Sequence, residues 1–399
     1  MLNVGLAFGG VSPEHEVSVI SSLQAAAALD TARFNAVPIY IAKDGAWYTG
    51  RTLLDLERYS DLGSVVRSAV PVVIDTRKRG KLRIAEPRRW GLRAVADIDV
   101  MLLGLHGGSG EDGGLQGLCE VVDVPYTGSG ILGSSVGMDK CVSKMLCREN
   151  GIPVVEFAQL RERDWAGSEE RMLDRLESFP GFPCVVKPAR LGSSIGIGFA
   201  STRTELSRYI EEALRYDAKL VIERAVSDLV EINCAVLGNP EEASASVLEQ
   251  PVTTGGSVLS YGDKYMRRGA GSKGGSKVSA AGMASLDRII PAPLDEVRTN
   301  EIRNLAVRIF RLFECAGVAR IDFMIDERTD RVYFNEINTI PGSFSFYLWR
   351  PAGVDFTDLV SRMIDLAIER HDAAVAHIRS YDVNLLSSAS LRGIKRAKG

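Results

Sequence analysis

The sequence predicts an α/β protein whose chain opens on a parallel sheet, and three observations support this fold class. Residues 2–8 form an apolar run that ends at two glycines, which is typical of a buried strand. Residues 18–29 carry a helical pattern, and residues 34–41 form a second apolar run. A strand, a helix and a strand in this order favour a βαβ unit and therefore a parallel sheet.

The alternation of strands and helices continues after a less regular segment. Residues 43–98 show no clear period and carry basic patches, so we expect loops and an irregular insertion there. Residues 100–105 form another buried strand. Residues 138–150 place apolar side chains on one helical face, and Gly151 and Pro153 then end the helix.

The second half of the chain contains further elements and one long glycine-rich segment. We expect strands at 182–187, 220–223, 231–237, 318–325 and 332–338, and helices at 301–314 and 356–369. Residues 255–282 are rich in Gly, Ser and Lys, and a loop of this length inside a compact domain is usually a functional lid or disordered. Residues 387–399 form a polar, basic tail.

The composition excludes several functional classes. Lysine and arginine number 48 against 51 aspartates and glutamates, which argues against a strongly cationic nucleic-acid or membrane-surface protein. No apolar run approaches the roughly 20 residues of a membrane helix. The apolar start of the chain lacks a basic segment, and Glu14 and Glu16 follow it, so we expect no signal peptide.

The cysteines and histidines give little support to a metal site. The 6 cysteines form no CxxC pair, and the 4 histidines lack the spacing of metal ligands. Reduced, mostly buried thiols in a cytoplasmic protein are the simpler interpretation.

Two glycine-rich segments are candidate phosphate loops. Residues 128–133 match the dinucleotide pattern GxGxxG, but the pattern is short, lies in the middle of the chain and arises easily among 39 glycines. The other segment starts at Lys187, where a strand ends, and continues as a Gly/Ser loop to Gly198. Small residues let backbone N–H groups approach phosphate oxygens, and the lysine adds a charge, so we favour phosphate binding here over a tight surface hairpin.

A predicted hairpin brings two carboxylates together. If strands 318–325 and 332–338 form a symmetric hairpin centred near Thr329, Asp322 lies opposite Glu336 and Arg320 lies opposite Asn338. The same period-two pattern puts the Phe334 side chain on the face of Glu336 and Asn338.

Opposed carboxylates are destabilising unless one is protonated or a cation lies between them. Two carboxylates and an amide oxygen form an all-oxygen set that suits Mg²⁺ shared with substrate phosphates. The alternative is a solvated strand face on which Arg320 pairs with Asp322. Together with the Lys187 loop, the magnesium interpretation indicates nucleotide-dependent phosphoryl chemistry.

On seven ordered motifs, the chain resembles the D-alanine–D-alanine ligases of the ATP-grasp superfamily. The motifs are residues 9–18, residues 106–117, residues 126–140, the Lys187 loop, the pair Glu223 and Glu231, residues 320–323, and residues 336–342. The resemblance covers almost the whole chain, and it identifies the GxGxxG pattern as part of the third motif.

The resemblance implies an ATP-grasp fold, with a parallel-sheet domain followed by a two-lobed nucleotide-binding module. The implied boundaries are an N-terminal domain at 1–137, a central lobe at 138–229, a C-terminal lobe at 230–380 with the lid at 255–282, and a basic tail at 381–399.

The resemblance also implies roles for individual residues. The implied ATP ligands are Lys140, Lys187, Ser194, Glu223, Glu231 and Lys264. The implied ligands of Mg²⁺, or of Mn²⁺, are Asp322, Glu336 and Asn338. The implied catalytic residues are Glu14, Ser193, Tyr265, Arg320 and Gly342, and the implied substrate contacts are Glu14, His106 and Tyr347.

The resemblance implies that Glu14 takes the ammonium group of the first substrate and that His106 lies near its carboxylate. It also implies that Arg320 and the backbone N–H of Gly342 stabilise the oxyanion, and that Lys264 and Tyr265 close the lid.

The implied function is an ATP- and Mg²⁺-dependent ligase that joins two D-alanines for peptidoglycan through an acyl phosphate. The resemblance also implies small-molecule substrates, no nucleic-acid or membrane partner, and a homodimer. One position departs from the family, because Tyr347 stands where a serine normally anchors the second substrate's carboxylate. Ser343 or Ser345 could compensate, or both could be plain turn residues, and Tyr265 matches the dipeptide-forming members. The alternatives are a sibling ligase with another acceptor and a non-catalytic nucleotide-binding protein.

Overall fold

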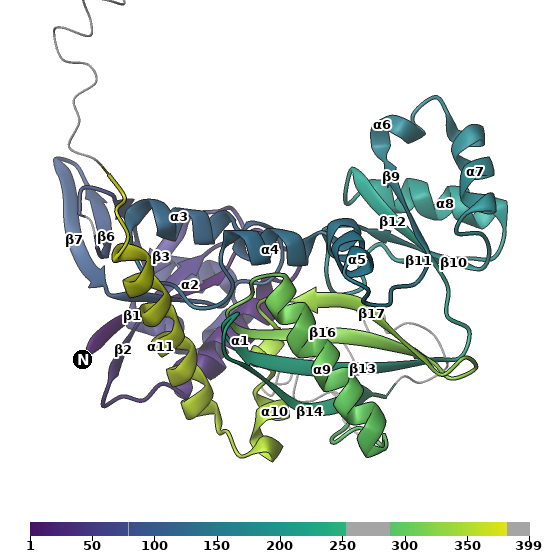
Figure 1. The fold of residues 1–399 in the computed structure, drawn as a ribbon. Helices are drawn as coiled ribbons and strands as arrows, with labels where there is room; N and C mark the ends of the chain where they lie inside the picture. Colours follow the sequence, from purple (N-terminus) through teal and green to yellow (C-terminus); the bar gives the residue numbers. More distant parts are fainter. Residues whose placement is uncertain (79, 253–287, 381–399) are drawn as a thin grey trace, which may run out of the picture.

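The computed structural model describes residues 1–78, 80–252 and 288–380, and its described residues form α/β layers around four sheets. Figure 1 shows a small lobe, built from β9–β12 and α6–α8, that stands apart from the rest of the molecule. The proposed lid, Lys264, Tyr265 and the basic tail lie outside the described residues.

The first sheet has the strand order β4-β3-β2-β1-β8 and confirms the predicted βαβ opening. Strand β1 (Leu2–Gly9) pairs in parallel with both β2 (Phe34–Ile41) and β8 (Val100–Leu103). Helix α1 (His15–Ala27) connects β1 to β2 and begins three residues before the expected position. Glu14 is therefore the N-cap residue of α1 and lies just beyond the carboxyl end of β1.

The prediction of an irregular insertion at residues 43–98 was wrong. Strands β5 (Val73–Asp75), β6 (Leu82–Arg88) and β7 (Gly91–Ile98) form a three-stranded antiparallel sheet. The remaining elements here are β3 (Trp47–Thr49), η1 (Arg51–Leu54), η2 (Leu56–Ser60), α2 (Leu62–Ser68) and β4 (Val70–Pro71). Residues 91–95 of β7 are all exposed, so no apolar alternation marks this strand in the sequence.

The small lobe carries a four-stranded sheet of order β11-β10-β12-β9. Its elements are β9 (Phe157–Arg161), α6 (Glu162–Trp165), α7 (Glu169–Ser178), β10 (Cys184–Pro188), β11 (Gly198–Ala200), α8 (Arg203–Leu214) and β12 (Lys219–Arg224). Apolar side chains of α7 and α8 pack on the sheet in a core of their own. The lobe thus presents the end of β10, where Lys187 lies, to the rest of the molecule.

The large C-terminal sheet has the order β15-β14-β13-β16-β17. Its elements are β13 (Leu229–Gly238), β14 (Ala243–Pro251), β15 (Arg288–Ile289), α9 (Glu296–Leu312), β16 (Gly317–Asp326) and β17 (Arg331–Asn338). The helices that connect or follow the sheets are η3 (Gly108–Gly110), α3 (Gly114–Val122), α4 (Ile131–Met138), α5 (Lys140–Glu149), η6 (Gly342–Ser345), α10 (Phe346–Trp349), η7 (Arg350–Ala352) and α11 (Phe356–Val375). Side chains of α9 cover one face of this sheet, which leaves its other face for polar residues.

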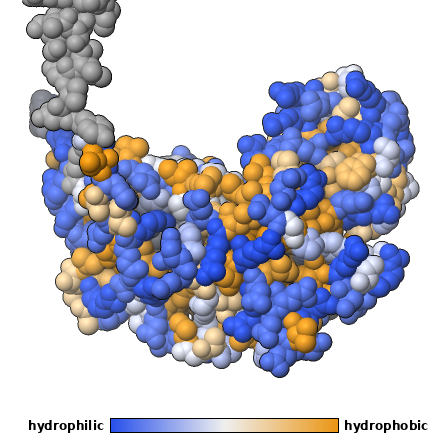
Figure 2. Space-filling model, in the orientation of Figure 1, coloured by the Kyte–Doolittle hydropathy of each residue, from blue (hydrophilic) through white to orange (hydrophobic). Residues whose placement is uncertain are grey.

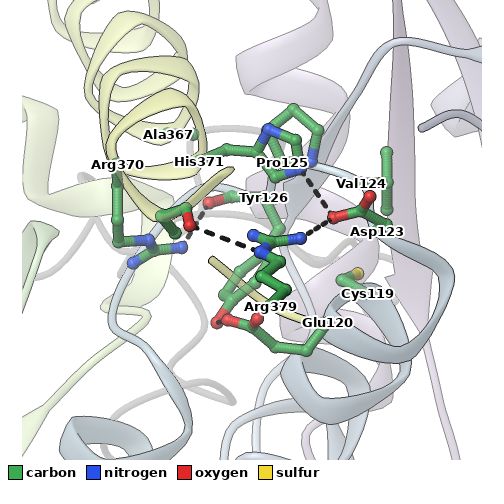
Figure 3. Close-up of a pocket in the computed structure, with 11 residues that line it drawn as sticks. Cys119, Glu120, Asp123, Val124, Pro125, Tyr126, Ala367, Arg370, His371 and Arg379 are labelled. Atoms are coloured by element: carbon green, nitrogen blue, oxygen red, sulfur yellow. Dashed lines mark hydrogen bonds and ion pairs between the residues drawn. The ribbon is translucent and has the colours of Figure 1, made fainter. Parts of the chain in front are cut away.

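The last helix, α11, packs against the N-terminal core and is tied to it by charged side chains (Figure 3). Arg370 donates hydrogen bonds to the carbonyl oxygens of Tyr126 and Gly128, at 2.8 and 2.7 Å. Asp123, at the end of α3, accepts from Arg379 and lies 3.3 Å from the His371 ring. The small hollow between α3 and α11 is lined by these groups and contains none of the predicted site residues.

Two further properties of the structure bear on function. All 6 cysteines are free and buried, as the sequence predicted. Within the described parts of the chain, no helix is both long and apolar enough to span a lipid bilayer.

Candidate active site

A buried carboxylate between two lysines lies where the small lobe meets the large sheet. Glu223 on β12 is 3.1 Å from the Nζ atom of Lys144 on α5, and Lys187 on β10 donates to it at 2.7 Å. Burial disfavours the charged carboxylate, but the two lysines outweigh burial and lower the pKa of Glu223 to about 2. The cluster therefore keeps Glu223 ionised and fixes the position of Lys187.

Lys187 also reaches the large sheet through a residue in a β-bulge. Its Nζ donates to the side-chain oxygen of Asn335 at 3.2 Å. The register between β16 and β17 shifts by one residue here, because Asp322 pairs with Glu336 while Phe323 pairs with Phe334. The bulge leaves Asn335 unpaired and directs its side chain toward the lysine.

The same bulge corrects one sequence-based expectation. The predicted pairs Asp322–Glu336 and Arg320–Asn338 are confirmed. The prediction that Phe334 shares a face with Glu336 is wrong, since Phe334 lies in the apolar core and contacts the ring of Phe313. A symmetric hairpin cannot anticipate an extra residue in one strand.

Lys140 is the second lysine that the sequence predicted at the site, and it contacts the carboxylate pair directly. Its Nζ lies 3.0 Å from Glu336 and donates to the backbone oxygen of Leu191 at 2.8 Å. Lys140 is 7% exposed, and although burial opposes the charged form, Glu336 raises its pKa. The lysine thus connects the Gly/Ser loop of the small lobe to the predicted metal ligands.

Asp322 is held by the arginine that the sequence placed beside it. Arg320 donates two hydrogen bonds to the two oxygens of Asp322, both at 2.7 Å, and Asn338 lies 3.1 Å from the same carboxylate. This is the pairing that the alternative to a metal site predicted, but the pair is buried rather than solvated. No group of three His, Cys, Asp or Glu side chains among the described residues could hold a metal ion, so any ion here depends on the amide of Asn338.

The polar row continues across the large sheet beyond the predicted residues. In the strand pairing, Glu249 on β14 lies opposite Asn233 on β13, Asn233 opposite Asp322, and Asp322 opposite Glu336. Asn233 donates to Glu249 at 2.9 Å. Glu231, two residues before Asn233 on the same strand, shares its face and lies on the site side of the sheet.

The Gly/Ser loop of the small lobe contacts the N-terminal domain. The Ser193 hydroxyl donates a short hydrogen bond to the carboxylate of Glu14, and Ser193 and Ser194 both have left-handed backbone angles, with φ of 55° and 58°. Two residues that the sequence assigned to one catalytic group therefore meet, although they are 179 positions apart. Ser194 is half-buried beside them.

His106 is buried and Glu111 is half-buried in the segment that follows β8, and both have shifted pKa values. Burial lowers the pKa of His106 to about 4, so the ring is neutral at pH 7. Burial, followed by repulsion from Glu14, raises the pKa of Glu111 to about 7, although the backbone N–H groups of Gly107 and Ile340 donate to it. Glu111 lies within a motif that the sequence identified, but its raised pKa depends on folded contacts.

These two shifts predict opposite effects of pH on stability. The folded state binds fewer protons at His106 than the unfolded state between about pH 6.5 and 4. The folded state is therefore increasingly destabilised by His106 as the pH falls through this range. The folded state binds more protons at Glu111, so its penalty grows as the pH rises from 4.5 through about 7. Relative to the wild type, His106→Gln should lose less stability on acidification, and Glu111→Gln should gain stability toward pH 7, each by roughly 1–3 kcal/mol. Urea unfolding at pH 4.5, 5.5, 6.5 and 7.5 measures both slopes, and parallel curves for wild type and variants would refute the assignment.

Tyr347, on α10, is fixed by a buried ion pair. Its hydroxyl lies 3.4 Å from Glu249, and Arg288 donates to the same carboxylate at 2.6 Å. The Arg288 guanidinium lies 4.0 Å from the centre of the Tyr347 ring. A phenol has a single proton, which this geometry directs to Glu249. Nearby, the hydroxyl oxygens of Ser343 and Ser345 are buried and have no hydrogen-bond partner in the described structure.

The sequence missed several residues of this site. Lys144 is fully buried and follows Lys140 by one helical turn, a spacing that was visible in the sequence. Asn335, Asn233, Glu249 and Arg288 gave no local signal, because the bulge and the pairing of five strands bring them to the site.

Comparison with protein families agrees with this geometry. The family model described as the D-ala D-ala ligase N-terminus matches residues 3–129, and the one described as the D-ala D-ala ligase C-terminus matches residues 146–365. The chain belongs to the D-alanine–D-alanine ligase family. The described residues have the ATP-grasp fold that the sequence predicted.

Individual members of the ligase family are similar over nearly their full length. The chain is 37% identical to a D-alanine--D-alanine ligase of Thermosipho melanesiensis, covering 97% of this chain and 98% of the relative. It is 38% identical to the ligase of that name from Caldicellulosiruptor bescii, covering 93% and 96%.

Solved ligase structures superpose on most of the chain. The D-alanine-D-alanine ligase from Coxiella burnetii is 30% identical, with a TM-score of 0.75 and coverage of 94% and 96%. The VanG D-Ala:D-Ser ligase from Enterococcus faecalis is 27% identical, with a TM-score of 0.75 and coverage of 92% and 99%.

Proposed function

We propose that this member of the ligase family is an ATP-dependent enzyme that joins two D-alanines into the dipeptide used for peptidoglycan. The observation that carries the proposal is the Lys140–Glu336 contact of 3.0 Å, which brings a phosphate-binding lysine to the opposed carboxylates. A lysine, an arginine and an aspartate that are buried beside a half-buried glutamate form the kind of charged cluster that gathers at functional sites.

The nucleotide lies between the central lobe (138–229), which contains the small lobe, and the C-terminal lobe (230–380) in this proposal. Lys140 and Lys187 bind its phosphates and Ser194 covers them, while Glu223 and Glu231 contact the adenosine end. Glu223 has a second task, because its contact with Lys187 keeps that ammonium in place. The family resemblance also implies roles for Lys264 and Tyr265, which lie outside the described residues.

The residues fit a magnesium ion, with manganese as the other ion of suitable chemistry. Asp322 and Glu336 face each other across two paired strands, and the Asn338 amide lies beside them. Carboxylate and amide oxygens are the ligands that Mg²⁺ prefers when it is shared with substrate phosphates. When bound, the ion would neutralise charge on the transferred phosphoryl group.

The residues of the chain support a two-step reaction. A carboxylate oxygen of the first D-alanine attacks the γ-phosphorus of ATP and releases ADP, while Glu14 holds the ammonium group. The amine of the second D-alanine then attacks the acyl carbon, and the oxyanion develops beside Arg320 and the N–H of Gly342. Phosphate leaves, the amine loses a proton and the peptide bond is formed.

We further propose that the enzyme acts in the cytoplasm as a homodimer on small-molecule substrates only. The six buried, free thiols agree with a reducing compartment.

The acceptor assay tests the proposed function. Each reaction contains the purified protein, ATP, Mg²⁺ and D-alanine as the first substrate. The acceptor added in excess is D-alanine, D-serine or D-lactate, and the products are identified by mass spectrometry. D-alanyl-D-alanine as the main product supports the proposal. ATP binding without any ligated product would contradict it.

The second candidate is a ligase with the same activation step and another acceptor, and the one observation in its favour is Tyr347. Because Tyr347 is bulkier than a serine and its hydroxyl is directed to Glu249, the acceptor pocket differs from the usual pattern. D-alanine as acceptor remains the better supported choice, since the similar curated relatives carry the name D-alanine--D-alanine ligase. A predominant mixed product in the acceptor assay would reverse this preference.

A further inference from the structure

The turn that contains Gly342 is held from both sides by side chains of the N-terminal domain. Before Gly342, the N–H of Ile340 donates to Glu111 at 3.3 Å, and the backbone of Ile340 also bonds to His106. After Gly342, the N–H of Ser343 donates to the hydroxyl of Ser21 at 2.8 Å. The peptide groups on each side of the proposed oxyanion donor are therefore fixed by residues more than 200 positions away.

Ser21 links the two sides of this arrangement. Its oxygen accepts from Ser343, so its single proton is directed to the Nε2 atom of His106, 3.1 Å away. His106 is then neutral and carries its proton on Nδ1, from which it donates to the carbonyl oxygen of Ile340. The hydrogen bonds close a circuit around Pro341 and Gly342. Both side chains are buried, at 1% exposure for Ser21 and 4% for His106.

The backbone beyond Gly342 needs such support. Ser343, Phe344 and Ser345 have φ values of 52°, 52° and 51°, which is the left-handed region that residues other than glycine rarely adopt. Such conformations persist only where the surrounding structure fixes them. The Ser21 hydrogen bond anchors the first of these residues, and the Phe344 side chain is buried in the N-terminal core.

We propose that Ser21 is a positioning residue that orients the Gly342 N–H toward the developing oxyanion, through its hydrogen bonds to Ser343 and His106. This inference rests on the proposed function, because it concerns a step of the ligase reaction. Ser21 touches no reacting atom and acts only on the geometry of the turn.

The neighbouring residue offers a matched control for the test. Ser22 lies on the same helix and is fully buried, and its hydroxyl donates to the carbonyl oxygen of Gly104 at 3.3 Å. Ser21→Ala and Ser22→Ala thus remove the same atom at a similar depth, but the Ser21 hydroxyl accepts a hydrogen bond from the turn, whereas the Ser22 hydroxyl is directed to Gly104. For Ser21→Ala we expect kcat to fall about 10- to 100-fold, with the KM values for ATP and the first D-alanine changed less than about threefold. Ser22→Ala should keep kcat within about threefold of the wild type.

A second readout separates positioning from a general structural effect. A phosphinate analogue of the dipeptide carries a tetrahedral centre that mimics the oxyanion, so its affinity should fall with kcat in Ser21→Ala. The affinity for ADP should not change. Ser21→Cys keeps the size of the side chain with a weaker donor and acceptor, and should show a smaller loss of both kcat and phosphinate affinity.

The outcomes distinguish this inference from the proposed function. Unchanged kcat and phosphinate affinity in folded Ser21→Ala or Ser21→Cys overturn the inference alone. Equal losses of kcat in the Ser21 and Ser22 variants, with phosphinate affinity retained, overturn it as well, because the effect is then structural. A wild-type protein that binds ATP but forms no peptide bond overturns the proposed function and the inference with it.

Discussion

Glu336→Gln is expected to reduce dipeptide formation by at least about 10³-fold while the protein stays folded. The substitution keeps the size of the side chain but removes the charge that faces Asp322 and pairs with Lys140. Losing one carboxylate ligand should weaken the neutralisation of the transferred phosphoryl group by several kcal/mol, and each ~1.4 kcal/mol is tenfold in rate. Phosphate release in the presence of D-alanine, followed over a range of Mg²⁺ concentrations, measures the effect.

A carboxylate in the same hairpin serves as the control for this experiment. Glu327 lies in the exposed turn between β16 and β17, so Glu327→Gln removes the same charge without touching the site. It should retain wild-type turnover. If Glu336→Gln also turned over ATP and D-alanine normally with Mg²⁺, the assignment of the metal ligands would be wrong.

The sequence predicted much of the site because its residues occur in short motifs on regular elements. The opposition of Asp322 and Glu336 followed from the period-two pattern and the length of the hairpin link, and the strand pairing confirms it. Glu14 and Ser193 were assigned to the catalytic site only by the family resemblance, and their contact was not predicted, since no local pattern connects two loops so far apart.

Other features depend on tertiary packing and could not be predicted from one sequence. The β-bulge that turns Asn335 toward Lys187 also moves Phe334 into the core, and neither change leaves a mark in the hydrophobic pattern. The sheet β5-β6-β7 escaped prediction because β7 is exposed along most of its length. The pKa values of His106 and Glu111 follow from burial, which the sequence does not report.

Arg320→Lys is the second substitution with a large expected effect, because it separates charge from geometry. Arg320 donates in parallel to both oxygens of Asp322, each at 2.7 Å, and is 8% exposed. Lysine keeps the positive charge but cannot form this planar, bidentate contact. We expect kcat to fall about 10²-fold, the scale of losing one oxyanion donor, with smaller changes in the KM values.

The matched control is Arg331→Lys, at the exposed start of β17, which should leave kcat unchanged. Arg320→Met should lower both kcat and stability more than Arg320→Lys does. It removes the oxyanion donor, and it also removes the main partner of the buried Asp322. Breaking a buried ion pair in this way costs about 3–5 kcal/mol of stability, which thermal unfolding would detect. If Arg320→Lys instead kept kcat within about threefold, positive charge alone would suffice at this position. The fixed guanidinium beside Asp322 would then serve the stability of the sheet rather than the oxyanion.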